Sequence, residues 1–178
     1  ILRYHYLAYT HASALYVSDY NGAVRTVFHG FLKGTLKNLC QQPNVLQSFI
    51  SDYIFDLQSF ALAFKDLIIA TRTDERLYRI FVILGLSTRL YPLTIRLQQR
   101  GLLRTQVPNT YVDLLQCLDV CDVRIYKTRG TDPAKVIGDL SQESRTASVQ
   151  DIANGLQNFV MWFMPDGTFQ TSLSQDMY

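Results

Sequence analysis

The stretch VLQSFISDYIFDLQSFALAFKDLI, residues 45–68, decides the fold class of this chain. Its apolar residues recur every three or four positions without a break, which is the period of an amphipathic helix. The apolar face is broad enough to contact two neighbouring helices. We therefore expect this segment to be the central helix of the first half of the chain.

Helical periodicity continues on both sides of this stretch, with short connections and no series of alternating strands. Further helices are expected over about residues 2–10, 24–39, 74–84, 91–100, 108–129, 133–140 and 148–163, with a short one in the tail from 168. The sequence thus predicts an all-α fold, a multi-helix bundle or array of about eight helices. We expect residues 1–178 to form one domain, and the change from an aromatic-rich to an arginine-rich half allows a soft subdivision near 70–73.

Turn and cap residues set the expected boundaries. Ser18–Gly22 has the composition of a turn, and Asp132 before Pro133 is typical of a helix start. Ser148 with Asp151 three residues later predicts the start of the last long helix. The brief alternation at 123–125 also allows a short strand, although continued helix fits the flanking pattern better.

Composition and charge exclude several classes of protein. The chain has 178 residues, 48% of them hydrophobic and 18% charged, with a net charge of +2, so it is neither disordered nor strongly basic. Its longest apolar run, Ile80–Leu86, falls well short of the roughly 20 residues that span a bilayer. The chain begins without Met and already with helical spacing, so we expect a piece of a longer protein with no membrane partner.

The cysteines indicate a reducing cytoplasm. Cys40, Cys117 and Cys121 are too few for a disulfide framework. Cys117 and Cys121 share a helix face at i, i+4, but a zinc site needs two further ligands, and no histidine stands at a recognised spacing. Core cysteines are therefore favoured, and neither a metal nor a cofactor is expected in this chain.

Arginines are concentrated in the middle of the chain, where they form two candidate nucleic-acid-binding stripes. One has the spacing i, i+4, i+7 and the other i, i+4, i+8: Arg72, Arg76, Arg79 and Arg96, Arg100, Arg104. On two helices, such rows are the kind of surface that follows a phosphate backbone. The alternative is a solvated helix face, or a face paired with acids elsewhere in the chain.

A third group of cations flanks the break at Gly130. The candidates for phosphate contact or domain docking are Arg124, Lys127 and Arg129. Local pairing that fixes the turn is the alternative, with the carboxylates of Asp119, Asp122 and Asp132. Catalysis has no nominated residue, because the chain has no Gly-x-Ser-x-Gly, phosphate-loop, Gly-x-Gly-x-x-Gly or His-Glu-x-x-His motif. Whether the chain is an enzyme stays open.

Three segments together resemble the helical middle of the GmrSD-like family of modification-dependent restriction endonucleases. They are LRYHYL at 2–7, VRIYKTRG at 123–130 and PDGTF at 165–169, in matching order. In that family an N-terminal domain carries an Asp-Gly-Gln-Gln-Arg motif linked to nucleotide use and DNA cleavage, and a C-terminal domain carries an HNH-type nuclease motif. This chain has neither motif, so the resemblance transfers no catalytic residue.

The resemblance implies a cytoplasmic bacterial defence protein. Within it, this chain is expected to be a non-catalytic helical scaffold or docking domain whose partners are the flanking nuclease domains, with contact to a DNA backbone through the arginines. The alternative is a helical protein-interaction domain unrelated to restriction.

Overall fold

The computed structural model describes residues 1–9, 20–130 and 134–175. Nine α-helices and two π-helical segments form this part of the chain, which contains no β-strand. In chain order they are α1 (Leu2–Tyr9), α2 (Tyr20–Leu39), α3 (Pro43–Ala70), α4 (Glu75–Tyr78), η1 (Arg79–Ile83), α5 (Tyr91–Gln99), α6 (Leu114–Cys121), η2 (Asp122–Thr128), α7 (Ala134–Glu143), α8 (Val149–Phe163) and α9 (Asp166–Gln175). The all-α prediction is confirmed.

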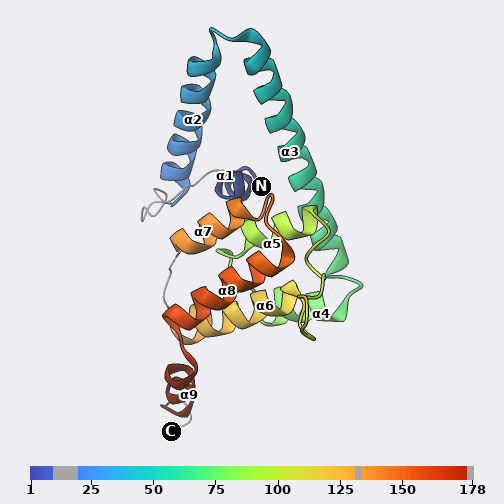
Figure 1. The fold of residues 1–178 in the computed structure, drawn as a ribbon, viewed down its shortest axis with the longest axis vertical. Helices are drawn as coiled ribbons and strands as arrows, with labels where there is room; N and C mark the ends of the chain where they lie inside the picture. The colour runs from blue at the N-terminus through green and yellow to red at the C-terminus, as the bar shows by residue number, and fades with distance from the viewer. Residues whose placement is uncertain (10–19, 131–133, 176–178) are drawn as a thin grey trace.

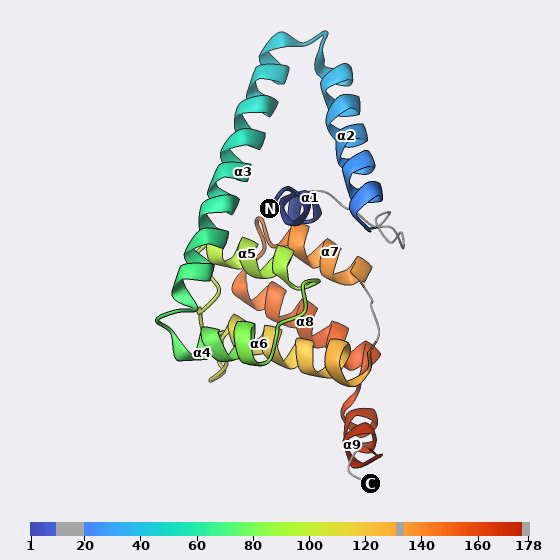
Figure 2. The same ribbon diagram turned by 180° about the vertical axis from the view of Figure 1, so that it is seen from behind.

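The helices form a body with two projections. Helices α1 and α4 to α8 pack together, and α2 and α3 rise from them as a hairpin arm that opens away from its connecting turn (Figure 1). Figure 2, the view from behind, shows the same arm and places α9 at the opposite end, beyond α6 and α8. None of the described helices combines the length and the apolar composition that crossing a bilayer requires.

Helix α5 is the centre of the body. Every residue from Pro92 to Leu97 is buried, and the helix packs against α1, α3 and α7. A helix that is buried on all sides must satisfy its own polar groups. Thr94 does so through its hydroxyl, which donates to the carbonyl of Leu90 at 2.8 Å. The short helix α5, rather than the long α3, therefore organises the packing.

Helix α3 contacts α1, α2 and α5, but it buries only a narrow stripe. The buried residues are Tyr53, Phe60, Ala63 and Leu67. Seven of its other large apolar side chains are exposed, whereas Leu46, Phe49, Leu57 and Phe64 are half-buried: the exposed ones are Val45, Ile50, Ile54, Phe55, Leu62, Ile68 and Ile69. The broad apolar face seen in the sequence is thus only partly covered within this chain.

Several helix boundaries confirm the sequence prediction. Pro92 lies in the first turn of α5, and Gly101 follows that helix with φ 69°, a left-handed conformation that glycine adopts readily. Ser148 caps α8 through a complete capping box with Asp151. The Asp132–Pro133 prediction falls outside the described residues.

Other boundaries differ from the prediction. Helix α6 begins at Leu114, with Asp113 as its N-cap, because residues 107–113 form a tight turn in which Asn109 has φ 60°. Tyr111, within the predicted helix at 108–129, lies in this turn instead and is fully exposed. The predicted turn at 18–22 is wrong from Tyr20 onward, where α2 begins, since turn-forming residues are also tolerated in the first turn of a helix.

The second half contains two further differences. Residues 122–128 continue α6 as a π-helix, so the short-strand alternative is wrong. The tail helix α9 forms, but it starts at Asp166. Phe169 packs against the core, whereas Leu173 is exposed.

Candidate docking groove between α6 and α8

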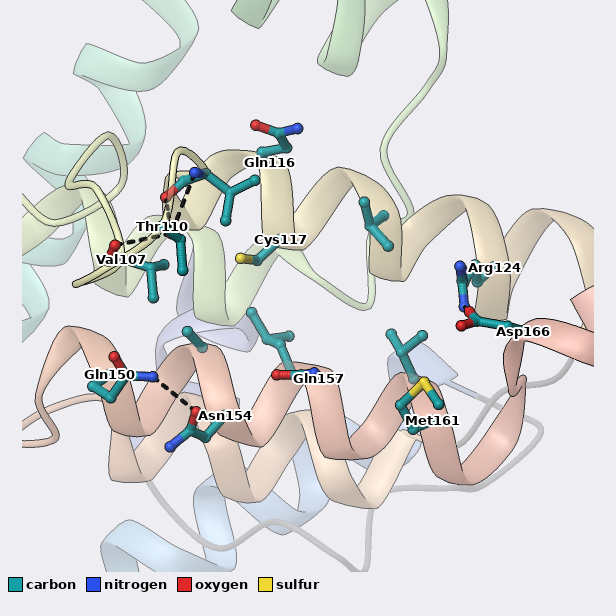
Figure 3. A pocket seen from close by; sticks show the side chains of 15 residues that line it. Val107, Thr110, Gln116, Cys117, Arg124, Gln150, Asn154, Gln157, Met161 and Asp166 are labelled. Carbon is teal, nitrogen blue, oxygen red and sulfur yellow. Dashed lines mark hydrogen bonds and ion pairs between the residues drawn. The ribbon is translucent and has the colours of Figure 1, made fainter.

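A groove of about 470 Å³ lies between α6 and α8, which pack side by side (Figure 3). Each helix contributes residues one turn apart. From α6 and η2 come Cys117, Val120 and Arg124, and from α8 come Gln150, Ala153, Asn154, Gln157, Val160 and Met161. Helical spacing places such residues on one side of each helix, so the two sides face each other across the groove.

The floor of the groove is apolar and its edge on α8 carries amides. Leu156 and Val160 are buried beneath the groove, whereas Val120 is 45% exposed and Met161 is 44% exposed. On α8, Gln150 donates to Asn154 at 2.9 Å (Figure 3). This combination of apolar floor and polar edge is typical of sites that bind an apolar surface and orient it by a few hydrogen bonds.

An ion pair closes one end of the groove. Arg124 on η2 donates to Asp166, the first residue of α9, at 2.6 Å. The same guanidinium lies 4.7 Å from the centre of the Phe169 ring, in cation–π geometry. Arg124 thereby fixes α9 against η2, although its predicted local partners were other carboxylates.

A turn closes the other end. Val107 donates its backbone N–H to the carbonyl of Val112 at 2.9 Å, and the Thr110 hydroxyl donates to the carbonyl of Val107 at 2.9 Å. These bonds hold the turn that precedes α6, and the side chains of Val107 and Val112 line the groove. Both ends of the groove are therefore held by bonds within this chain, one by an ion pair between η2 and α9 and the other by a hydrogen-bonded turn.

The groove offers little chemistry beyond its shape. Burial raises the pKa of the Cys117 thiol, so the thiol stays protonated at neutral pH and contributes an apolar wall. Burial likewise raises the pKa of Cys121, which lies in the core. Within residues 1–9, 20–130 and 134–175, no group of three or more His, Cys, Asp or Glu side chains lies close enough together to hold a metal ion.

Most of the arginines predicted to bind nucleic acid are engaged within the chain. Arg76 donates two hydrogen bonds to Asp113, at 2.5 and 2.7 Å, and these bonds raise the pKa of the guanidinium. Arg104 pairs with Asp74 at 2.7 Å. Arg100 donates to the backbone carbonyls of Ser144 and Ala147.

The row Arg96, Arg100, Arg104 does not form a surface stripe. Arg96 is 2% exposed and pairs with Asp56, whereas Arg104 lies beyond the end of α5. The i, i+4, i+8 expectation is wrong here because the helix is shorter than the arginine pattern and its interior face includes Arg96.

The cations beside Gly130 also have partners. Lys127 pairs with the buried carboxylate of Asp122, as the local-pairing alternative expected, and Arg129 lies 5.5 Å from the centre of the Phe163 ring. Arg72 and Arg79 differ from the others. Both are exposed, and within the described residues neither makes an ion pair or a side-chain hydrogen bond.

Sequence reasoning missed the partners of these arginines and one polar cluster. His5 on α1, Asp56 on α3 and Gln99 on α5 all bond within the cluster around Arg96. No local pattern marks them, because they lie on three separate helices.

Comparison of the chain with protein-family models, with curated proteins and with solved structures finds no match.

Proposed function

We propose that this chain is a helical docking domain and that the groove between α6 and α8 receives an amphipathic helix of its partner. The observation that carries this proposal is the apolar floor left open between two parallel rows of side chains. Helix-in-groove binding uses this arrangement, with apolar anchors of the partner helix at i, i+3, i+4 and i+7. From Gln150 to Met161 the groove follows α8 for about 16 Å, room for about three turns of a partner helix.

The ion pairs that arginines form within the chain support a scaffold function. A domain that holds other domains in place needs rigid connections between its own helices. The pairs Arg76–Asp113, Arg104–Asp74 and Arg124–Asp166 each join separate segments of the chain. Because these guanidinium groups are paired with carboxylates, they add little positive potential to the surface. Binding of a protein is therefore favoured over binding of a polyanion.

The resemblance to the GmrSD-like family suggests which partner this is. In this proposal the docked helix belongs to a nuclease part of a cytoplasmic bacterial defence system, either in the same polypeptide or in a companion chain. The alternative is a partner unrelated to restriction that presents the same kind of apolar helix. Both versions use the same groove, so the identity of the docked segment separates them.

Position-specific photo-crosslinking in cells of the source organism tests the proposal. A photoreactive phenylalanine analogue replaces Met161, which lines the groove, or Trp162, which is the next residue of α8, does not line it and is 83% exposed. The two positions share one helix, and both side chains are exposed to solvent. We expect a defined adduct from position 161 only, with the crosslink mapping to an amphipathic helical segment.

The mapped partner decides between the two versions. If the crosslinked protein carries the Asp-Gly-Gln-Gln-Arg or the HNH-type motif, the partner is a nuclease of the restriction family. If it is any other single protein, the version with a partner unrelated to restriction is supported. Equal adducts from positions 161 and 162, or no adduct from either, would contradict docking in the groove.

Contact with a DNA backbone is a second candidate function, and it rests on Arg72 and Arg79. Arg72 lies in the turn between α3 and α4, and Arg79 is the first residue of η1; both side chains are exposed and have no internal partner among the described residues. If each neutralises one phosphate, the salt dependence of duplex-DNA affinity should weaken by about 1.8 in log–log slope when both are replaced by Gln. An unchanged slope in that variant removes this candidate.

A further inference from the structure

A second cavity of about 740 Å³ lies away from the groove, where α3, α5 and the connection between α7 and α8 meet. All of its lining residues except Phe55 have polar or charged side chains. The residues that matter for its chemistry are Asp56, Arg96, Gln99, Arg100, Glu143 and Arg145. Three guanidinium groups from two parts of the chain thus converge on one cavity.

One of these guanidinium groups is already neutralised. Arg96 donates to both carboxylate oxygens of Asp56, at 2.6 and 3.0 Å. Asp56 Oδ2 also accepts from His5 Nε2 at 2.9 Å, and Oδ1 accepts from Gln99 Nε2 at 3.2 Å. Both carboxylate oxygens of Asp56 are therefore hydrogen-bonded. The Asp56–Arg96 ion pair contributes no net charge to the cavity.

The other two guanidinium groups keep their charge. Arg100 Nη1 donates to the carbonyls of Ser144 and Ala147, at 2.6 and 2.7 Å, which fixes its position without supplying a counter-charge. Arg145 lies 4.5 Å from the centre of the Tyr9 ring, which orients it by a cation–π contact. Among the described residues, neither makes an ion pair with a carboxylate.

One carboxylate opposes them. Glu143 lines the same cavity and makes no ion pair with a described residue. The cavity therefore holds two uncompensated cations against one uncompensated anion, a surplus of positive charge. Planar guanidinium groups that are held in place favour ligands with several acceptor oxygens.

We propose that this cavity binds the oxyanion group, phosphate or carboxylate, of a small molecule between Arg100 and Arg145. The Thr146 hydroxyl lines the same space and supplies a neutral polar group for the remainder of the ligand. Phe55, exposed at the edge of the cavity, offers a flat apolar surface to an aromatic portion of the ligand. This site is separate from the α6–α8 groove and does not depend on the docking function.

Calorimetric titration of the full chain with inorganic phosphate, and separately with acetate, tests the site at constant ionic strength. Arg145→Gln should weaken the binding of either anion by about tenfold, the value of one charge-assisted hydrogen bond. Glu143→Gln should strengthen it, because it removes the opposing charge. Lys65→Gln removes the same charge as Arg145→Gln from an exposed position of α3 outside the cavity, so it should leave the affinity unchanged.

These outcomes separate a site from general attraction of anions. Residues 143 and 145 are exposed, so unchanged thermal unfolding should accompany both substitutions. Saturable binding of phosphate alone identifies a phosphorylated ligand, and binding of both anions extends the class to carboxylates. No saturable binding of either anion, or equal weakening by Lys65→Gln and Arg145→Gln, would overturn the proposal.

Discussion

Asp56 and Arg96, which are 40 residues apart in the sequence, form a two-pronged ion pair inside the body of the protein. Arg96 also donates to the carbonyl of Ala8 at 3.3 Å, and its guanidinium carbon lies 5.2 Å from the centre of the Phe60 ring. The pair therefore ties α1, α3 and α5 together at one point. Arg96 thus stabilises the packing of three helices.

The first prediction concerns the cost of breaking this pair. Asp56→Ala leaves the buried guanidinium of Arg96 without a counter-charge, and we expect it to lower the free energy of unfolding by about 3–5 kcal/mol. Asp166→Ala breaks the Arg124 pair, whose carboxylate is 66% exposed, and should cost less than about 1 kcal/mol. Urea denaturation of both variants measures the difference, and equal costs would place Arg96 in solvent.

The same pair predicts how stability depends on acid. Burial alone would raise the pKa of Asp56, but the hydrogen bonds from His5 and Arg96 outweigh it and hold the pKa well below the ordinary value of 3.8. The folded state then favours the ionised carboxylate. Its contribution to stability is complete above about pH 4 and is lost as the pH falls further. In urea denaturation between pH 2 and 6, Asp56→Asn should show a smaller loss towards acid than wild type. An equal loss of stability towards acid in both proteins would show that Asp56 does not cause it.

A third prediction concerns alkaline pH. Burial raises the pKa of Tyr53 to about 12, and within the described residues its hydroxyl is buried without a hydrogen-bond partner. The neutral phenol is favoured in the folded state, so its contribution is complete below pH 10 and is lost as the pH rises towards 12. Tyr53→Phe should leave stability at pH 7 unchanged or raise it by up to about 1 kcal/mol. It should also reduce the alkaline loss, as thermal unfolding at pH 7 and pH 11 can measure.

Two phenylalanines on α3 provide the fourth prediction. Phe60 is fully buried in the core, whereas Phe55, five residues earlier on the same helix, is 72% exposed. Phe60→Ala should cost about 3–5 kcal/mol because it opens a cavity, whereas Phe55→Ala should change stability by no more than about 0.5 kcal/mol. Chemical denaturation of the two variants checks which side of α3 faces the core. Similar losses would mean that the outer face is packed.

Local sequence signals predicted the fold well. The capping box at Ser148 and Asp151, and the pair Pro92 and Gly101 around α5, act over one helical turn and can be recognised from the residues themselves. The start of α6 was misplaced because Pro108 favours a helix start, whereas Asp113 supplies the cap in the structure. Competing signals six residues or fewer apart are resolved only by the packing of the following helix.

The candidate site was much less predictable. Helical periodicity predicted helices over 108–129 and 148–163, and Leu118 and Leu156 are buried on α6 and α8. The groove, however, lies beside those faces, and periodicity cannot tell which flank of a helix a neighbour covers. Charge partners were hidden for a related reason, since Arg76 and Asp113 are 37 residues apart and meet only when the helices pack.

The most direct measurement of the docking proposal is the crosslink from position 161 with and without a charge in the groove. Val120 lines the groove opposite α8 and is exposed, so Val120→Lys should leave thermal unfolding unchanged while placing a cation against the docked apolar helix. Our account predicts that the adduct formed in wild type falls at least about tenfold in the Val120→Lys background. An adduct of undiminished yield in that background would show that the partner binds elsewhere.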